Sequence, residues 1–330
     1  MIRTASSTWS KRKRLEAALS GAKPDRPPVA LWRHWPGDDQ DAEALAAASL
    51  KWQRDYDWDL LKVGPASTYS VVDWGVEDRW EGHIEGTRAY VRRAIHAPDD
   101  WEKLAPLDPT RGMLATQVEA LRRVGAELGE ATPFIATVFS PLSQAKHLAD
   151  KEPLISHLRS HPASLQRGLE AITASTIRFI EAAKATGISG IFYAVQHARY
   201  PVMSRAEFET FGRPYDLRVL EAASDLWLNV LHVHGADMAF DWVADYPAQV
   251  VNWHDRETAV SLADGLQQIQ GAASGGVDHW TLHQEGPAGA LAEARDALEQ
   301  TGGRRLLLGT GCVIMVTTPT RNIRALREFV

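Results

Sequence analysis

Two stretches that lie far apart in the chain carry the residues best suited to bind a metal ion. His232 and His234 end an apolar, partly β-branched run at residues 228–235. In a strand, residues i and i+2 point to the same face, so the two imidazoles are expected to project side by side. Cys312, the only cysteine of the chain, follows a second apolar run at residues 305–309. Two imidazoles and one thiolate suit zinc, and three protein ligands with one open position are typical of a catalytic zinc site.

The same residues also have an ordinary structural interpretation. Histidines at strand ends often do no more than hydrogen-bond to their neighbours, and a lone buried cysteine usually packs as a small hydrophobic side chain. A His-x-His pair with a distant cysteine therefore does not establish a metal site by itself. Both interpretations stay open until the elements that position these residues are considered.

The composition restricts the class of protein. The chain has 330 residues, enough for two average domains or one α/β barrel, and its net charge of −6 gives no support for nucleic-acid binding. A single cysteine excludes an internal disulfide framework and indicates a reducing compartment. The chain has no apolar stretch of about 18 residues and no apolar signal segment, so we expect a cytoplasmic protein without a membrane partner.

Apolar runs bounded by turn residues alternate with helical patterns along the chain. Eight runs read as strands, at residues 29–33, 59–63, 133–138, 188–194, 228–235, 249–253, 271–277 and 305–309. Helical patterns fill most connections, including one near residues 238–245, whereas residues 69–93 hold a predicted hairpin. This alternation, without a linker of biased composition, predicts a single (β/α)8 barrel of the TIM type over residues 1–330, with a helical extension at 1–25.

The predicted barrel brings distant polar residues together. The carboxyl ends of the strands in such a barrel meet at one mouth, where the chemistry is located. The predicted strand ends place Arg33, Tyr193, His234, Asn252 and Cys312 around this mouth. The meeting of the histidines and the cysteine is thus a consequence of the predicted fold, because sequence spacing alone does not imply it.

Several motifs resemble those of the uroporphyrinogen decarboxylase superfamily. The most specific is the closing motif, which comprises Leu-Leu-Gly-Thr-Gly-Cys-Val-Ile at 307–314, Thr-Pro at 318–319 and Asn-Ile-Arg-Ala-Leu at 322–326. Similar segments are Arg-Pro-Pro-Val at 26–29, Ser-Arg-Ala-Glu-Phe-Glu at 204–209 and Arg-Pro-Tyr at 213–215. The resemblance covers nearly the whole chain and implies a TIM-type barrel and a homodimer.

The chain departs from the true uroporphyrinogen decarboxylases of that superfamily. Those enzymes carry an Arg-Gln-Ala-Gly-Arg-Tyr motif after the first strand, and its arginines hold substrate carboxylates. Here only Arg33 matches, and Asp38 and Asp39 follow it. Recognition of a polycarboxylate depends on arginine forks, so this stretch has too little positive charge for a porphyrinogen. The closing motif of the decarboxylases also has histidine where this chain has Cys312.

The resemblance is nearer to the zinc-dependent methyltransferases of the superfamily, which work with corrinoid proteins. Those carry His-x-Cys on the fifth strand and a cysteine in the closing motif, so His232 and Cys312 match and His234 replaces the first cysteine. Replacing a thiolate by a neutral imidazole leaves the site one charge more positive. That change makes the zinc a better Lewis acid and a bound substrate thiolate less nucleophilic.

The leading functional hypothesis is therefore a zinc-dependent methyltransferase. It would move a methyl group between a small thiol or methyl ether and a corrinoid. The chain has no Asp-x-His-x-x-Gly corrinoid-binding signature, so the corrinoid would be carried by a partner protein. Three acidic residues are candidates to orient the zinc-binding histidines, namely Asp237, Asp241 and Asp255.

Two other hypotheses remain. The first is a decarboxylase or lyase that acts on a small carboxylic acid, with or without a metal; Arg33 would bind the carboxylate, and Tyr193 or His254 would transfer the proton. The second is a barrel without catalytic activity that binds an apolar ligand. Its candidate binding residues are three tryptophans near the mouth, Trp32, Trp35 and Trp253.

Overall fold

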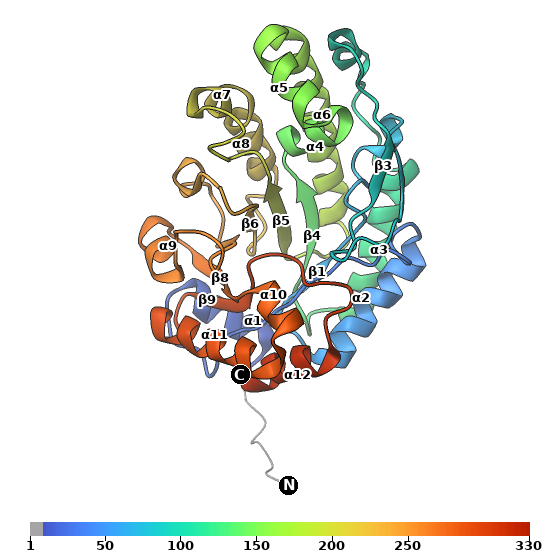
Figure 1. The fold of residues 1–330 in the computed structure, drawn as a ribbon. Helices are drawn as coiled ribbons and strands as arrows, with labels where there is room; N and C mark the ends of the chain where they lie inside the picture. Colours follow the sequence, from blue (N-terminus) through green and yellow to red (C-terminus); the bar gives the residue numbers. More distant parts are fainter. Residues whose placement is uncertain (1–8) are drawn as a thin grey trace.

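A computed structural model describes residues 9–330 and shows a curled parallel sheet surrounded by helices (Figure 1). The sheet has seven strands, and each pairs with the next one along the chain. The strands are β1 (Leu61–Val63), β4 (Phe134–Phe139), β5 (Gly190–Val195), β6 (Val230–Val233), β7 (Val250–Trp253), β8 (Ala272–Val277) and β9 (Leu306–Thr310). All their residues are buried, as expected for a parallel sheet covered on both faces. The predicted TIM-type barrel fold is confirmed.

The eighth predicted strand, at residues 29–33, closes the barrel in a less regular way. Val29 forms a single parallel bridge to Leu308 of β9, and the Val29 carbonyl accepts a hydrogen bond from the Asp59 N–H at 3.0 Å, just before β1. Pro27 and Pro28 have no N–H to donate, which limits the ladder here. This segment therefore lies between the last strand and the first one, although its pairing is too short to count as a strand.

Helices fill the connections between the strands. They are α1 (Lys11–Leu19), α2 (Ala42–Tyr56), α3 (Gly112–Leu128), α4 (Pro141–Ala149), α5 (Lys151–Ser160), α6 (Pro162–Lys184), α7 (Arg205–Phe211), α8 (Arg213–Ala222), α9 (Leu262–Gln268), α10 (His279–Gln284), α11 (Gly286–Thr301) and α12 (Thr320–Phe329). Side-chain caps begin several of them; Ser204, for example, forms a capping box with Glu207. The helix predicted near residues 238–245 is wrong, since only a 3-10 turn, η3 (Phe240–Trp242), forms there.

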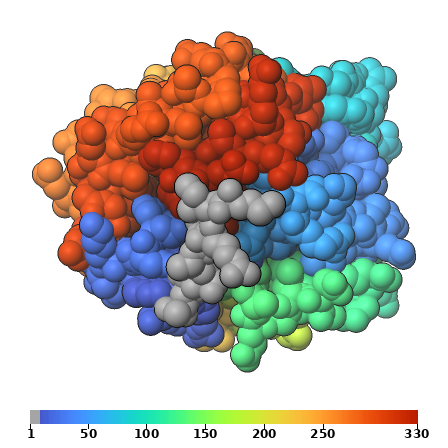
Figure 2. Space-filling view, turned by 90° about the horizontal axis from the view of Figure 1, so that it is seen from below, coloured from blue at the N-terminus to red at the C-terminus, as the bar shows by residue number. Residues whose placement is uncertain are grey.

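The N-terminal segment lies beside the C-terminal part of the chain, at the end of the barrel opposite the mouth. Of the predicted extension 1–25, residues 1–8 lie outside the described residues, and α1 forms the rest of its helical part. Figure 2 shows the blue N-terminal part beside the orange and red C-terminal part on this face. Arg304 reaches the Gly21 carbonyl at 3.1 Å, which joins the two ends of the chain. Within residues 9–330, no helix is long and apolar enough to span a membrane.

A predicted hairpin interrupts the alternation after β1. Strands β2 (Glu77–Arg79) and β3 (Ala89–Arg92) pair antiparallel, which confirms it, between two 3-10 turns, η1 (Val72–Trp74) and η2 (Pro98–Lys103). The loop between the two strands contributes Glu85, Thr87 and Arg88 to the wall of a cavity at the barrel mouth. The hairpin thus covers part of the site described next.

Candidate metal centre

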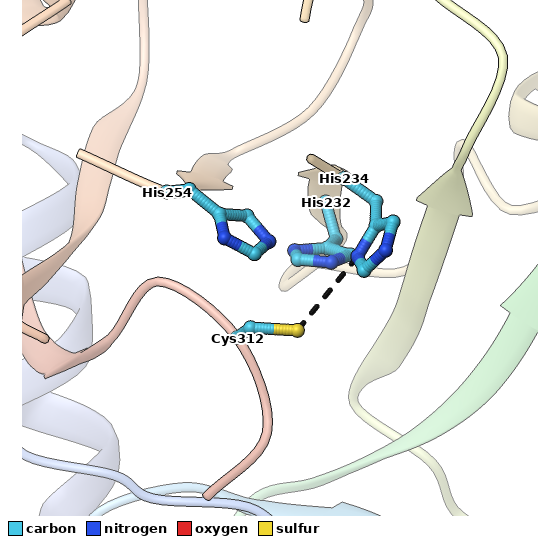
Figure 3. Close-up of side chains that lie close together, drawn as sticks. All are labelled: His232, His234, His254 and Cys312. Carbon is cyan, nitrogen blue, oxygen red and sulfur yellow. Dashed lines mark hydrogen bonds between the residues drawn. The ribbon is translucent and has the colours of Figure 1, made fainter. Parts of the chain in front are cut away.

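Four side chains from three strand ends converge at the barrel mouth (Figure 3). His232 lies on β6 and His234 directly after it, His254 follows β7, and Cys312 lies two residues after β9. Their ligand atoms all lie within 4.8 Å of one another. The Cys312 Sγ is 3.7 Å from the His234 Nδ1, the contact drawn as a dashed line. The structure thus brings the two histidines and the cysteine together, and His254 joins them.

The local backbone explains why these side chains meet. His234 donates its N–H to the Val195 carbonyl at 3.0 Å, so the chain stays extended past β6 and both histidines face the same side. Gly311 allows the cysteine loop to approach β7 closely. A Cβ at this position would lie 2.6 Å from the Trp253 carbonyl oxygen and 2.8 Å from the His254 Cα. Any larger residue at 311 would therefore push the Cys312 loop away from His254.

A buried amide orients His232. The His232 Nδ1 is 2.6 Å from the Asn252 Oδ1. The Asn252 Nδ2 donates to the Ser274 carbonyl at 2.9 Å and to the Thr310 carbonyl at 3.1 Å, so the amide oxygen must face the histidine. The His232 Nδ1 therefore carries the proton, and its Nε2 has a free lone pair. An outer partner that fixes the tautomer is what a metal-binding histidine requires.

A carboxylate holds His254 in a similar way. The His254 Nδ1 lies 2.9 Å from the Glu257 Oε1, and His279 places its Nε2 3.7 Å from the same oxygen. The His254 Nε2, in contrast, is buried without a hydrogen-bond partner. A buried polar atom without a partner is costly unless a ligand satisfies it. This nitrogen is therefore available to a metal ion or to a substrate proton.

The electrostatics of the cluster suit a cation. Burial raises the pKa of the Cys312 thiol, but its interactions with His232, His234 and His254 outweigh burial and hold that pKa well below the ordinary value. For His254, burial lowers the pKa, whereas Cys312 and Glu257 raise it to about 10. Without a metal ion, the buried thiolate is thus balanced by a proton on an imidazole. A metal cation at the same point would replace that proton.

The donor set fits zinc. Zinc binds histidine nitrogen at about 2.0 Å and cysteine sulfur at about 2.3 Å, so tetrahedral ligands of this kind lie about 3.5 Å apart. The 3.7 Å between Cys312 Sγ and His234 Nδ1 is close to this spacing. Three nitrogens and one sulfur are also the donors that zinc prefers over magnesium or calcium. His232, His234 and Cys312 could hold the ion, with His254 facing the fourth position.

The prediction that three acidic residues orient the histidines is wrong, because each of them binds a different partner. Asp237 lies 3.4 Å from Arg199, and Asp241 accepts a hydrogen bond from the Tyr200 hydroxyl at 2.5 Å. Asp255 accepts the Gly276 N–H at 3.1 Å. Asn252 and Glu257 orient the histidines instead. The available signals were a polar Asn252 inside the apolar predicted strand 249–253 and an acidic Glu257 four residues after it.

Arg33 and Tyr193 do not reach the histidines, contrary to expectation. The Arg33 guanidinium stacks over Trp35 at 4.7 Å and lines a separate hollow against α2. Tyr193 points to the helix side of β5, where its hydroxyl donates to Asp216 at 2.6 Å. The neighbours of each residue, Trp32 and His34 or Phe192 and Ala194, line the cavity instead. In both cases the side chain faces away from the cavity, while its two sequence neighbours face it.

Three residues of the cluster, His232, His234 and Cys312, line a cavity of about 290 Å³. Trp32, a tryptophan predicted near the mouth, lines it. The lining also includes residues that the sequence did not single out, namely His34, Lys62, Glu85, Arg88, Lys146, His147, Phe192 and Gln196. Lys62 could have been found, because it is the one charged residue inside the apolar run 60–63. The others come from helices and loops whose distance from the mouth is not visible in sequence.

Comparison with known proteins agrees with this architecture. The uroporphyrinogen decarboxylase (URO-D) family model matches residues 10–330. The methylcobamide:CoM methyltransferase MtbA of Methanosarcina acetivorans is 20% identical over 335 residues, covering 97% of each chain. A methyltransferase structure from Methanosarcina mazei superposes with a TM-score of 0.82 at 20% identity, covering 97% of this chain and 98% of that one. A B12-independent methionine synthase from Shewanella sp. W3-18-1 gives 0.56 at 14% identity, with 93% and 92% covered. The chain belongs to the uroporphyrinogen decarboxylase (URO-D) family.

Proposed function

We propose that this protein is a zinc-dependent methyltransferase that moves a methyl group between a small substrate and a corrinoid carried by a separate protein. The observation that carries the proposal is the convergence of His232, His234, His254 and Cys312 beside a cavity. The similarity to a methylcobamide:CoM methyltransferase supports methyl transfer as the reaction. A thiol or a methyl ether is the substrate class that this donor set would serve.

The residues of the cluster have distinct roles in this proposal. His232, His234 and Cys312 would hold zinc, which when bound supplies a Lewis acid that acidifies a thiol or polarises an ether oxygen. His254 is placed to accept at its Nε2 the proton that a substrate thiol loses. Glu257, 2.9 Å from the Nδ1 of His254, would stabilise the resulting imidazolium. Asn252 keeps the Nε2 of His232 directed at the same point.

The methyl group would pass between the substrate and a cobalt atom that this chain does not carry. In the direction of thiol methylation, a thiol and a methyl-cobalt(III) corrinoid give a thioether, a cobalt(I) corrinoid and a proton. The chain contains no Asp-x-His-x-x-Gly signature, which supports a partner protein as the corrinoid carrier. The partner would dock over the barrel mouth, where the cavity lies.

The alternative of a decarboxylase or lyase receives less support. Two of the three residues assigned to it, Arg33 and Tyr193, lie away from the cavity. The third, His254, belongs to the His-Cys cluster but is not one of the residues that line the cavity. The donor set of three imidazoles and one thiolate has no evident use in a metal-free decarboxylation, whereas it is well suited to a metal ion.

Elemental analysis together with a methyl-transfer assay tests the proposal. We expect about one zinc ion per chain in the wild-type protein, and its loss in Cys312→Ala and His234→Ala. Free methylcobalamin can replace the partner, and its absorbance spectrum reports the formation of cobalt(I). With small thiols as acceptors, the zinc-loaded protein should demethylate it, and Cys312→Ala should be slower by at least a hundredfold.

Two controls separate a specific loss from a damaged fold. Arg33→Gln and Tyr193→Phe alter residues outside the cavity, so both should keep zinc and turnover. Circular dichroism should show the same helix content in all the variants. Wild-type protein that stays free of zinc after purification without chelator and incubation with the ion, or zinc-free protein with full turnover, would refute the proposal.

A further inference from the structure

One lysine projects from the barrel wall into the cavity without a counterion. Lys62 lies on β1 and is only 5% exposed, yet within residues 9–330 its ammonium has no carboxylate partner and no hydrogen bond. It lies over the Phe192 ring at 4.5 Å from the centroid. Trp32 packs edge-on against the same ring at 5.2 Å. The ammonium therefore sits against an aromatic wall of the cavity that Cys312 also lines.

An uncompensated buried ammonium is expensive. Burial lowers the pKa of Lys62 to about 8, and Cys312 opposes this shift. At neutral pH the side chain still carries most of its charge. Folds keep buried charges when a partner compensates them, and where the protein offers none, a ligand is the remaining candidate. The position of Lys62 inside a cavity makes this explanation concrete.

A second lysine reaches the same cavity from α4. The Lys146 Nζ is 3.3 Å from the Gln196 Oε1, an uncharged acceptor that also lies 3.1 Å from the His147 Nε2. Asp150 is the carboxylate whose charge acts on Lys146. It is exposed, however, and pairs with Arg93 at 3.6 Å. Burial lowers the pKa of Lys146 to about 8. Lys146 is thus a half-buried cation without a carboxylate contact.

The remaining charged groups do not cancel the two lysines. Arg88 lines the cavity but is already paired with Asp78 and Asp39. Glu85 is the one carboxylate among the lining residues, and it lies half-buried on the hairpin loop. His34 is uncharged at neutral pH because burial and Lys62 lower its pKa to about 4. The Cys312 thiolate also lines the cavity, but the proton on His254 balances it. The cavity beside the metal-binding cluster is therefore positive.

We propose that Lys62 and Lys146 form a subsite for the anionic group of a small organic substrate whose reacting end lies at the His-Cys cluster. The assignment of the reacting end rests on the proposed function; the anion subsite does not. The cavity of about 290 Å³ is at the small end of ligand sites, which suits a short molecule. Trp32 and Phe192 would contact its apolar link.

The chemistry of the anion follows from the residue type. A lysine ammonium is a compact point charge, whereas an arginine fork selects planar carboxylates or phosphates by paired hydrogen bonds. Two lysines recognise charge and not shape. A carboxylate and a sulfonate share the required chemistry, and the head group preferred must be measured.

Three matched thiols test the subsite: 3-mercaptopropionate, 3-mercapto-1-propanesulfonate and neutral 3-mercapto-1-propanol. We expect the zinc-loaded protein to bind at least one of the two anions at least tenfold more tightly than the alcohol, by calorimetry. In Lys62→Met this preference should fall at least tenfold, while binding of the alcohol stays the same. Arg33→Met, which removes a cation outside the cavity, is the matched control and should keep the preference. The order of the two anions identifies the head group.

A thiol-free arm separates this proposal from the proposed function. Propionate and 1-propanesulfonate should bind to Cys312→Ala, which lacks a metal-binding ligand, and this binding should be lost in Cys312→Ala/Lys62→Met. Anion binding without methyl transfer would leave the subsite standing and refute the proposed function. Equal binding of the three thiols by the wild type, or equal loss of all three in a folded Lys62→Met protein, would overturn the subsite.

Discussion

Two buried charged residues on one short segment have opposite surroundings. Asp59, just before β1, accepts hydrogen bonds from Arg14 at 2.7 Å, from Arg26 at 2.7 Å and from the Val29 N–H at 2.9 Å. Lys62, three residues later, has no such partner within the described chain and faces a cavity. The first charge is satisfied by the protein and joins the N-terminal segment to the sheet. The second charge is left for a ligand. A buried charge with partners in the protein thus has a structural role here, and a buried charge without them has a proposed binding role.

The largest effect on stability is expected from loss of Asp59, whose charge has partners in the protein. Asp59→Ala would remove the carboxylate that buried Arg14 shares with half-buried Arg26, and Arg14 would keep its ion pair with Asp25. The free energy of unfolding should fall by about 3–5 kcal/mol, as for other broken buried ion pairs. Urea denaturation measures this. Glu16→Ala removes an exposed partner of Arg12 and should change stability by less than about 1 kcal/mol. Equal effects of the two variants would contradict the comparison.

At the barrel mouth, loss of Asn252, which orients His232, should lower the affinity for a metal ion more than it lowers the stability of the fold. Asn252→Ala frees His232 to rotate and to change tautomer. Zinc affinity should fall by about 10–100-fold, the usual cost of losing such a partner. Competition with a chromophoric chelator gives the dissociation constant. Asn252→Asp keeps an acceptor oxygen for the Nδ1 proton and should retain more affinity; equal loss in both variants would argue against an orienting role.

Lys62 should destabilise the folded protein. Lys62→Met replaces an uncompensated buried ammonium by an apolar side chain of similar length. We expect the free energy of unfolding to rise by about 1–2 kcal/mol, a typical gain when a functional site is traded for stability. Differential scanning calorimetry on zinc-free protein would show it. A fall in stability would mean that the ammonium is satisfied in the fold and that the contrast with Asp59 is false.

The smallest effect concerns pH. The pKa values of Lys62 and Lys146 are lowered to about 8 in the free protein. Anion binding requires the protonated lysines, so it is fully present below this value and is lost as the pH rises through about 8. For each lysine that titrates, affinity for propionate should fall about tenfold per pH unit above it. Titration calorimetry at pH 7 and pH 9 measures the fall, and the neutral alcohol should show none of it by this route.

Sequence reasoning recovered the barrel and most of the donor set for identifiable reasons. Apolar runs of strand length predict the strands, and parallel strand ends meet at one mouth, which brings His232, His234 and Cys312 together. The errors concern which way a side chain faces. Tyr193 pairs in register with Leu231, whereas its neighbour Ala194 pairs with His232 and shares its face. That register depends on contacts between strands about 38 residues apart, so it cannot be read locally.

Arg33 and Lys62 further show which side-chain directions and partners cannot be predicted from sequence. Arg33 follows the irregular segment where Val29 makes the one bridge to β9, and a strand without a continued ladder does not alternate predictably. Lys62 lies in a regular strand, and a single lysine in an apolar run was a usable signal. Its missing counterion could not be foreseen, because that depends on every other element lining the cavity.

The tight packing of Gly311 against β7 has a consequence for how the protein would acquire a metal ion. Cys312 is the last donor to be synthesised and lies 78 residues after His234. Its loop reaches the histidines only after β9 has docked and the ends of the sheet have met. A cation that arrives earlier finds only the histidines, which bind it more weakly than the complete donor set. Zinc would then favour the closed barrel over any open intermediate, by an amount that grows with the free ion concentration. Metal uptake would thus serve as a readout of completed folding.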